Sequence, residues 1–169
     1  MNYTTLLEEA LEAWEDARTG AIEELQNIPE DRFDFRPVRN VRSVRELAIH
    51  ILEVAMMMTG ELTRPDTNFR RASWPKLLDL YAKKAYQLKS KRQTLAFMQK
   101  QFDEAVAKFR KAGEIHMFQL IQRFDGKMGT RFAWLRHGID QEMYHRGQLT
   151  TYARLLGIEP ALTKAIRAG

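Results

Sequence analysis

A repeated helix-start signal is the strongest constraint that this sequence places on its fold. A hydroxyl residue followed three positions later by Glu or Gln occurs at Thr5–Glu8, Ser43–Glu46 and Ser90–Gln93. In such a capping box the two side chains satisfy backbone N–H groups that the first helical turn leaves free. Apolar residues at helical spacing follow each signal, and Thr130 opens a fourth segment of the same kind. The pattern therefore predicts four long amphipathic helices.

Proline and glycine residues set the expected ends of these helices. We predict helices over about 4–27, 43–60, 90–113 and 130–156, with a shorter helix after Ser73. Residues 114–130 are predicted as either a short extended piece or part of a helix, and the tail from Ala161 is expected to fold back or fray. Four such helices predict an all-α four-helix bundle. The connections are long, so crossovers are allowed and a simple up-down-up-down order does not follow.

Composition narrows the functional classes. The chain has 169 residues and no cysteine, which excludes disulfides, cysteine-based zinc sites, iron–sulfur clusters and a thiol nucleophile of its own. The formal net charge of +5 lacks the dense basic stripe of a dedicated nucleic-acid binder. No apolar run approaches the ~20 residues of a transmembrane helix. The segment 1–16 has no basic residue, so we expect no signal peptide and a cytoplasmic protein. With no repeat or linker, residues 1–169 are predicted to form a single domain.

Histidine and glutamine residues provide a candidate metal site. Gln141 and His145 lie one helical turn apart on the same side, and so do His137 and Gln141. Two donors at this spacing can share one metal ion. A third donor must come from another helix, and His50, which lies among apolar residues, is the candidate. The alternatives are that His50 is an ordinary core histidine and that His137 lies at the rim of the bundle.

Several segments together resemble one known family. The string Glu142-Met-Tyr-His-Arg-Gly-Gln-Leu149, followed by 152–160, resembles the last-helix signature of the DinB/YfiT-like superfamily. The segment 47–51, Leu-Ala-Ile-His-Ile, is similar to the segment of its second helix that carries a metal histidine. Residues 124–126 and 130–131 resemble the approach to the last helix. The resemblance spans nearly the whole chain.

This resemblance implies a four-helix bundle, often dimeric, that holds a divalent metal, commonly nickel or zinc, in a cleft. The ligands carried over from the family are His50, Gln141 and His145. Position 141 departs from the pattern, because the family usually has histidine there. A glutamine oxygen is a harder and neutral donor, so the site is expected to be weakened, re-tuned or lost. A site one turn earlier, with His50, His137 and Gln141, is the alternative.

Family members with assigned activities include isomerases and S-transferases that use low-molecular-weight thiols such as mycothiol or bacillithiol. The first hypothesis is therefore a metal-dependent enzyme, a thiol-dependent S-transferase or a hydrolase, acting on a small-molecule substrate. Without cysteine, the attacking thiol would have to be a cofactor, and His137 or Tyr144 would assist proton transfer. The second hypothesis is a degenerate DinB-fold protein that serves as a stress-related binding protein. Nucleic-acid binding, suggested by net charge alone, is the third.

Other residues carry structural expectations. Arg146 and Gln148 are expected to fix helix contacts, and Gly147 to permit close helix packing. The methionines at 56–58 are interpreted as core filler and as a plausible surface for a homodimer. The basic run Lys83, Lys84, Lys89, Lys91 and Arg92 is interpreted as a solvated face.

Overall fold

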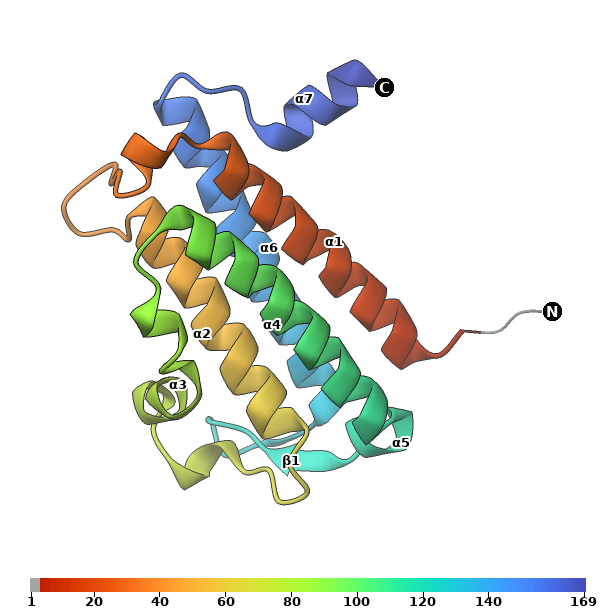
Figure 1. Cartoon of the computed structure of the whole chain (residues 1–169). Coiled ribbons are helices and arrows are strands. Elements are labelled where there is room, and N and C mark those ends of the chain that lie inside the picture. The colour runs from red at the N-terminus through yellow and green to blue at the C-terminus, as the bar shows by residue number, and fades with distance from the viewer. Residues whose placement is uncertain (1–3) are drawn as a thin grey trace.

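Four long helices form the body of the protein, as the computed structural model of residues 4–169 shows (Figure 1). They are α1 (Leu6–Asn27), α2 (Val44–Leu62), α4 (Lys91–Ala112) and α6 (Arg131–Leu155). The predicted all-α four-helix bundle is confirmed. The expectations for a domain from residue 1 and for no signal peptide include residues 1–3, which lie outside the described part. Within residues 4–169, no helix is both long and apolar enough to cross a bilayer.

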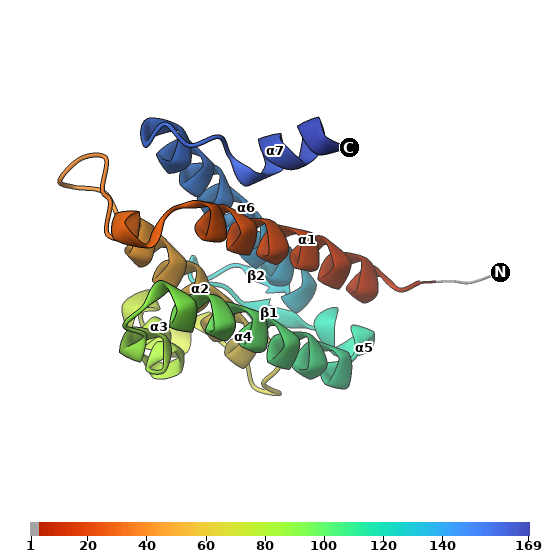
Figure 2. The same ribbon diagram turned by 45° about the horizontal axis from the view of Figure 1, so that its top comes forward.

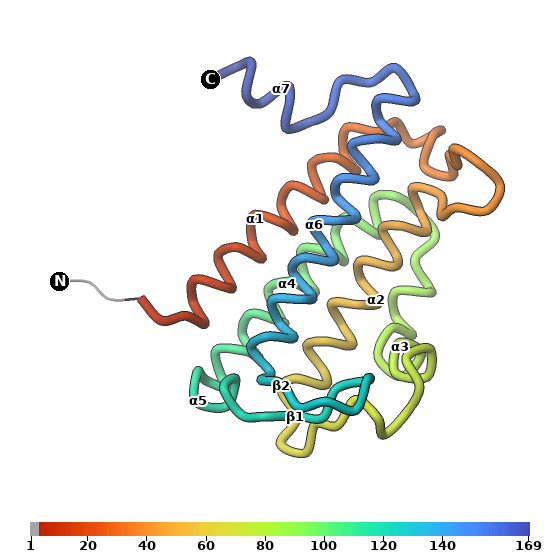
Figure 3. The backbone as a smooth tube through the Cα atoms, turned by 180° about the vertical axis from the view of Figure 1, so that it is seen from behind, coloured from red at the N-terminus to blue at the C-terminus, as the bar shows by residue number. Residues whose placement is uncertain are grey.

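The helices do not follow a simple up-down-up-down order. Helices α1 and α6 run in one direction, whereas α2 and α4 run in the other (Figures 1 and 3). Because α2 ends at the opposite end from where α4 begins, residues 63–90 must return along the bundle. This crossover holds three short helical elements: η2 (Phe69–Arg71), α3 (Trp74–Ala82) and η3 (Ala85–Gln87).

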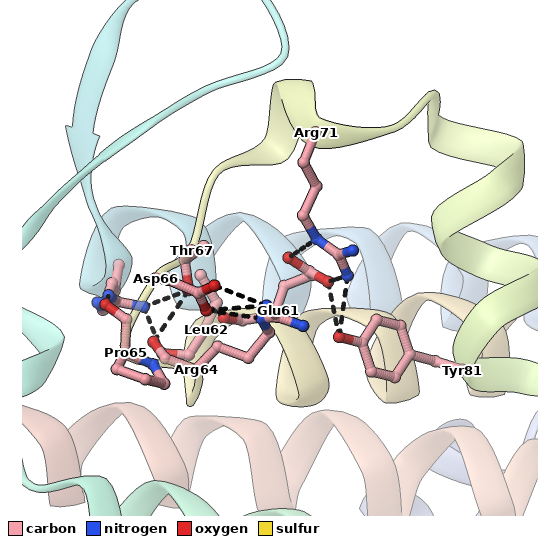
Figure 4. A network of polar contacts seen from close by, with 9 residues as sticks. Glu61, Leu62, Arg64, Pro65, Asp66, Thr67, Arg71 and Tyr81 are labelled. Atoms are coloured by element: carbon pink, nitrogen blue, oxygen red, sulfur yellow. Dashed lines mark hydrogen bonds and ion pairs between the residues drawn. The ribbon is translucent and has the colours of Figure 1, made fainter.

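A polar network anchors the start of this crossover (Figure 4). The buried Glu61 carboxylate pairs with Arg71 and accepts a hydrogen bond from the Tyr81 hydroxyl at 2.6 Å. Arg131, also buried, donates to the carbonyl oxygen of Leu62 at 3.1 Å. These contacts join the end of α2 to the crossover, to α3 and to the first residue of α6.

The predicted helix starts agree with the structure. Ser43 and Glu46 form a complete reciprocal capping box. Thr5 and Thr130 each accept a backbone N–H from the third residue after them. Ser90 also caps its helix, but the Gln93 side chain accepts the N–H of Lys89 instead of that of Ser90.

The segment between α4 and α6 resolves an alternative that the sequence left open. It forms the single turn α5 (Glu114–Met117) and an antiparallel hairpin of β1 (Leu120–Gln122) and β2 (Met128–Thr130). Gly126 lies in the turn with φ of 84°, a conformation that only glycine adopts at little cost. The hairpin crosses the end of the bundle where α6 begins (Figure 1).

Two further elements lie at the end of the bundle where α1 and α6 stop. The 3₁₀ turn η1 (Glu30–Arg32) follows α1, and helix α7 (Ala161–Ala168) follows α6. Helix α7 folds back toward α1 (Figure 2), where the buried Glu24 carboxylate accepts the N–H groups of Ala161 and Leu162. Of the two outcomes expected for the tail, folding back is the one observed.

The interpretation of the methionines as core filler is confirmed for Met57 and Met58, which are buried in the core. The homodimer surface stays a prediction. The solvated face expected for the basic run is correct for Lys83, Lys84, Lys89 and Arg92, which are exposed, but wrong for Lys91, which is buried. Its ammonium group donates to the carbonyl oxygens of Gln26 and Ile28, which the end of α1 leaves without helical partners.

A buried ion pair joins α1 to α6. Nε of Arg18 lies 2.6 Å from the Glu142 carboxylate, and both side chains are almost fully buried. The other carboxylate oxygen accepts hydrogen bonds from Trp14 Nε1 at 2.8 Å and from Arg18 at 3.0 Å. The carboxylate therefore has charged and neutral donors around it, which is what a buried charge requires.

We predict that Glu142→Ala will destabilise the protein by about 3–5 kcal/mol, because it leaves the Arg18 guanidinium buried without a counter-charge. Urea unfolding measures this loss. The control is Glu104→Ala, which removes an exposed ion pair with Lys100 and is expected to cost less than about 1 kcal/mol. Equal losses in the two variants would contradict the importance of the buried pair.

Candidate functional site

Two histidines from different helices meet inside the bundle. His50 of α2 and His145 of α6 lie with their ring centroids 4.9 Å apart and their planes at 81°. His145 is buried, and the His50 side chain is 12% exposed. The structure therefore brings together two of the three predicted ligands, which are 95 positions apart in the chain.

Each ring is held through its Nδ1 by a residue three positions later on the same helix. His50 Nδ1 lies 2.8 Å from Glu53 Oε2, and His145 Nδ1 lies 2.8 Å from Gln148 Oε1. Both neighbours accept hydrogen bonds, so both Nδ1 atoms carry a hydrogen, and a neutral ring held in this way keeps its lone pair on Nε2. Outer acceptors of this kind orient the histidines of metal sites.

The environment keeps His145 neutral. Burial lowers the pKa of its imidazole below the ordinary value, and the hydrogen bond with Gln148 offsets this only in part. The charges of His50 and Arg42 lower the pKa further. Its Nε2 is buried and has no hydrogen-bond partner in the described part of the chain. A neutral imidazole with a free buried lone pair is the form that binds a metal or accepts a proton.

Burial alone would raise the pKa of Glu53, but hydrogen bonding with His50 and Tyr86 lowers it overall. The carboxylate is thus ionised at neutral pH and acts as a fixed acceptor for His50 Nδ1. The residue that holds His50, Glu53, is therefore charged, whereas the residue that holds His145, Gln148, is neutral.

Gln141 lies beside the same site. It lines a small cavity with His145, Trp14 and apolar residues of α2. The free volume of this cavity is about 10 Å³, close to the space that a single water molecule needs. Among residues 4–169, no three His, Asp or Glu side chains come together in a way that could hold a metal. A metal site here would thus consist of two imidazoles and the Gln141 amide.

The other two histidines lie elsewhere. His137 is exposed and packs edge-on against Trp134, with ring centroids 5.0 Å apart. Nε2 of His116 lies 2.9 Å from the carbonyl oxygen of Leu62, at the end of α2. His116 therefore has a structural partner, and His137 is placed at the rim, as one of the alternatives expected.

A basic groove adjoins the histidine pair. It is lined by Arg36, Arg39, Arg42 and Arg45, which recur every third position across the connection into α2 and its first turn. Glu53 and Gln148, the partners of the two histidines, form part of its wall. The groove thus borders the residues that hold both rings, and the small cavity is lined by His145 itself.

Comparison with known proteins shows the family of this chain. The sequence profile of the DinB family matches residues 1–168. This chain belongs to the DinB family. No curated protein sequence matches it significantly.

Solved structures of DinB-like proteins share its fold. The DinB-like protein YjoA from Bacillus subtilis has a TM-score of 0.67 at 19% identity, covering 88% of this chain and 92% of its own. YfiT from Bacillus subtilis, described as a probable metal-dependent hydrolase with an unusual four-helix bundle topology, has a TM-score of 0.67 at 14% identity, covering 94% and 93%. The mycothiol-dependent maleylpyruvate isomerase has a TM-score of 0.65 at 13% identity, covering 86% of this chain and 61% of that one.

Within the DinB signature, two residues have roles that differ from those expected. Gly147 is exposed, and an added Cβ would meet nothing within 4 Å, so it does not mediate close packing. The close contact is instead at Gly20 of α1, where an added Cβ would lie 2.0 Å from Arg146 Cζ. Arg146 fixes a helix contact as expected, whereas Gln148 orients His145.

Sequence reasoning also missed Glu53 and the arginine groove. A signal for both was present. An acceptor follows each site histidine at the third position, and arginines recur at positions 36, 39, 42 and 45.

We predict that Tyr152→Phe will loosen residues 36–43, because the Tyr152 hydroxyl donates to the Arg42 carbonyl oxygen at 2.9 Å and ties this connection to α6. The free energy of unfolding should fall by about 0.5–1.5 kcal/mol. Hydrogen exchange in residues 36–43 should become faster. Tyr144→Phe is the control, since Tyr144 is exposed, and should change neither quantity. Unchanged exchange in the Tyr152 variant would contradict this role.

Proposed function

We propose that this DinB-family protein is a metal-dependent enzyme that acts on a small molecule, with His50, Gln141 and His145 as ligands of one divalent metal ion. The observation that carries the proposal is the unpartnered, buried Nε2 of His145 beside the His50 ring. An unpaired polar atom in a protein interior is costly, and a ligand that it can bind removes that cost. The same atom is the one that the Gln148 contact leaves free.

The arrangement of the protein's own groups supports metal binding. Glu53 and Gln148 orient the two rings, and burial keeps His145 unprotonated, so metal binding there displaces no proton from His145 at neutral pH. Gln141 lies one helical turn from His145 in the same cavity, so its amide oxygen is the third ligand that this helix offers. Nickel and zinc both accept imidazole ligands, and both are candidates.

A divalent metal held here would act as a Lewis acid that lowers the pKa of a water molecule or a thiol. The chain contains no cysteine, so a thiol nucleophile must arrive as a second substrate. The fold is shared with a mycothiol-dependent isomerase and with a probable metal-dependent hydrolase. We therefore propose that the activity is that of either a thiol-dependent S-transferase or a hydrolase.

A second function is favoured by one observation. Gln141 takes a position that would otherwise supply a third imidazole, and no other His, Asp or Glu among residues 4–169 completes the set. If the two imidazoles alone hold metal too weakly, the protein is a DinB-fold binding protein without metal chemistry.

We predict that the full chain, prepared without an affinity tag, binds one Zn²⁺ or Ni²⁺, measured by calorimetry and elemental analysis. Removing a ligand in His50→Ala or His145→Ala should weaken binding by more than the roughly 10–100-fold that loss of an outer hydrogen-bond partner costs. Gln141→His should strengthen binding, because imidazole is the better donor for both metals.

His137→Ala is the matched control and should bind as the wild type does. A loss of affinity in this variant would place the metal one turn earlier on α6 and contradict the ligand set. No binding by the wild type, with strong binding by Gln141→His, would favour the metal-free binding protein.

A further inference from the structure

The groove outside the histidine pair has a surplus of positive charge. Its volume is about 1060 Å³, and the charged side chains on its wall are four arginines and two glutamates, Glu46 and Glu53. Aliphatic side chains, among them Leu47 and Leu88, share the wall with them. A pocket of this size, with both charged and apolar lining, suits a small organic molecule.

Two of the four arginines are already engaged. Arg36 lies 2.8 Å from Glu46 and also donates to the Val41 carbonyl oxygen, which fixes the loop. Arg45 lies 2.7 Å from Asp34 and donates to the Lys89 carbonyl oxygen at 3.0 Å. These two guanidinium groups therefore have structural partners within the wall of the groove and beside it.

The other two arginines have no such role. Arg39 and Arg42 line the groove, are exposed, and in the described part of the chain form no ion pair with a carboxylate. The Arg42 backbone is fixed, because its carbonyl oxygen accepts the Tyr152 hydroxyl.

We propose that this groove binds a small organic molecule through an oxyanion group, a carboxylate or a phosphate, which Arg39 and Arg42 receive. Guanidinium groups form paired, charge-assisted hydrogen bonds with such groups, and two unpaired arginines match a ligand with one or two negative charges. The hydroxyl of Tyr86 and the Gln148 amide lie in the same groove as further polar groups. That the bound molecule is the substrate of the histidine site rests on the proposed function.

The location of the groove argues for a small ligand that contacts the site. Glu53 and Gln148 face the groove while they hold Nδ1 of His50 and His145, so a molecule bound there touches the residues that orient both rings.

The test uses metal-free protein, dialysed against a chelator, so that it does not depend on metal binding. Succinate and glycerol 2-phosphate are the two anionic probes, and succinamide is the neutral control, each titrated at low ionic strength and followed by calorimetry and amide chemical shifts. The variant is Arg39→Gln/Arg42→Gln. The matched control is Arg70→Gln/Arg136→Gln, two exposed arginines without ion pairs in residues 4–169.

We expect at least one anionic probe to bind, with shifts in residues 36–53 and 148–152, and succinamide not to bind. The Arg39/Arg42 variant should bind at least about tenfold more weakly, and the Arg70/Arg136 variant within about twofold of the wild type. Preference for succinate identifies a carboxylate ligand, and preference for glycerol 2-phosphate identifies a phosphate.

The proposal would be overturned by no binding of either anion, by equal weakening in both double variants, or by chemical-shift changes outside residues 36–53 and 148–152. Tighter binding of a short oligothymidylate that the Arg39/Arg42 variant loses would overturn it in favour of nucleic acid. His50→Ala should retain anion binding. If metal binding that depends on His50 is absent while the groove binds anions, the proposed function fails and the groove assignment stands. If metal binds but no anion does, the groove assignment fails and the proposed function stands.

Discussion

The buried contact of Glu142 with Arg18 and Trp14 fixes the rotation of α6, and the site depends on that rotation. Successive residues of an α-helix point about 100° apart. With Glu142 turned toward α1, the neighbouring Gln141 lines the cavity against α2, and His145 reaches the His50 ring. A helix rotated by one residue would bury a charge without a partner and separate the two histidines. The same ion pair thus serves both packing and site geometry.

The chain order provides the second condition. Helices α1 and α6 run parallel, and the crossover 63–90 makes α2 and α4 parallel to each other. This arrangement places α2 beside α6 with opposite directions, so His50, in the first half of α2, meets His145, in the second half of α6. Buried charges at Glu61 and Arg131 anchor the crossover at the far end. One end of the bundle therefore anchors the crossover, and the histidine pair lies toward the other end.

The sequence predicts the local features of this protein well. Helix starts at Thr5, Ser43 and Thr130 are correct because a cap depends on residues only three positions apart. Spacing predicts Gln141 and His145 as one pair of donors with His50 as a third from another helix, and the resemblance to the family implies the same set. Long-range partners were missed. Nothing near Glu142 in sequence reveals that Arg18, 124 positions away, neutralises it, and nothing near Lys91 shows that it caps the end of α1.

The histidine pair and the arginines Arg39 and Arg42 are held by different contacts. The rings are oriented by Glu53 and Gln148, each on the same helix as its histidine, so their geometry does not depend on residue 141 or on a metal. The two unpaired arginines are held by the 36–43 connection through Tyr152. A change at position 141 is therefore expected to leave the rings and the groove undisturbed, and under the proposed function it alters metal affinity alone. Exchange of an imidazole for an amide there is a local change in donor chemistry, and the surrounding structure keeps what is needed to position a ligand.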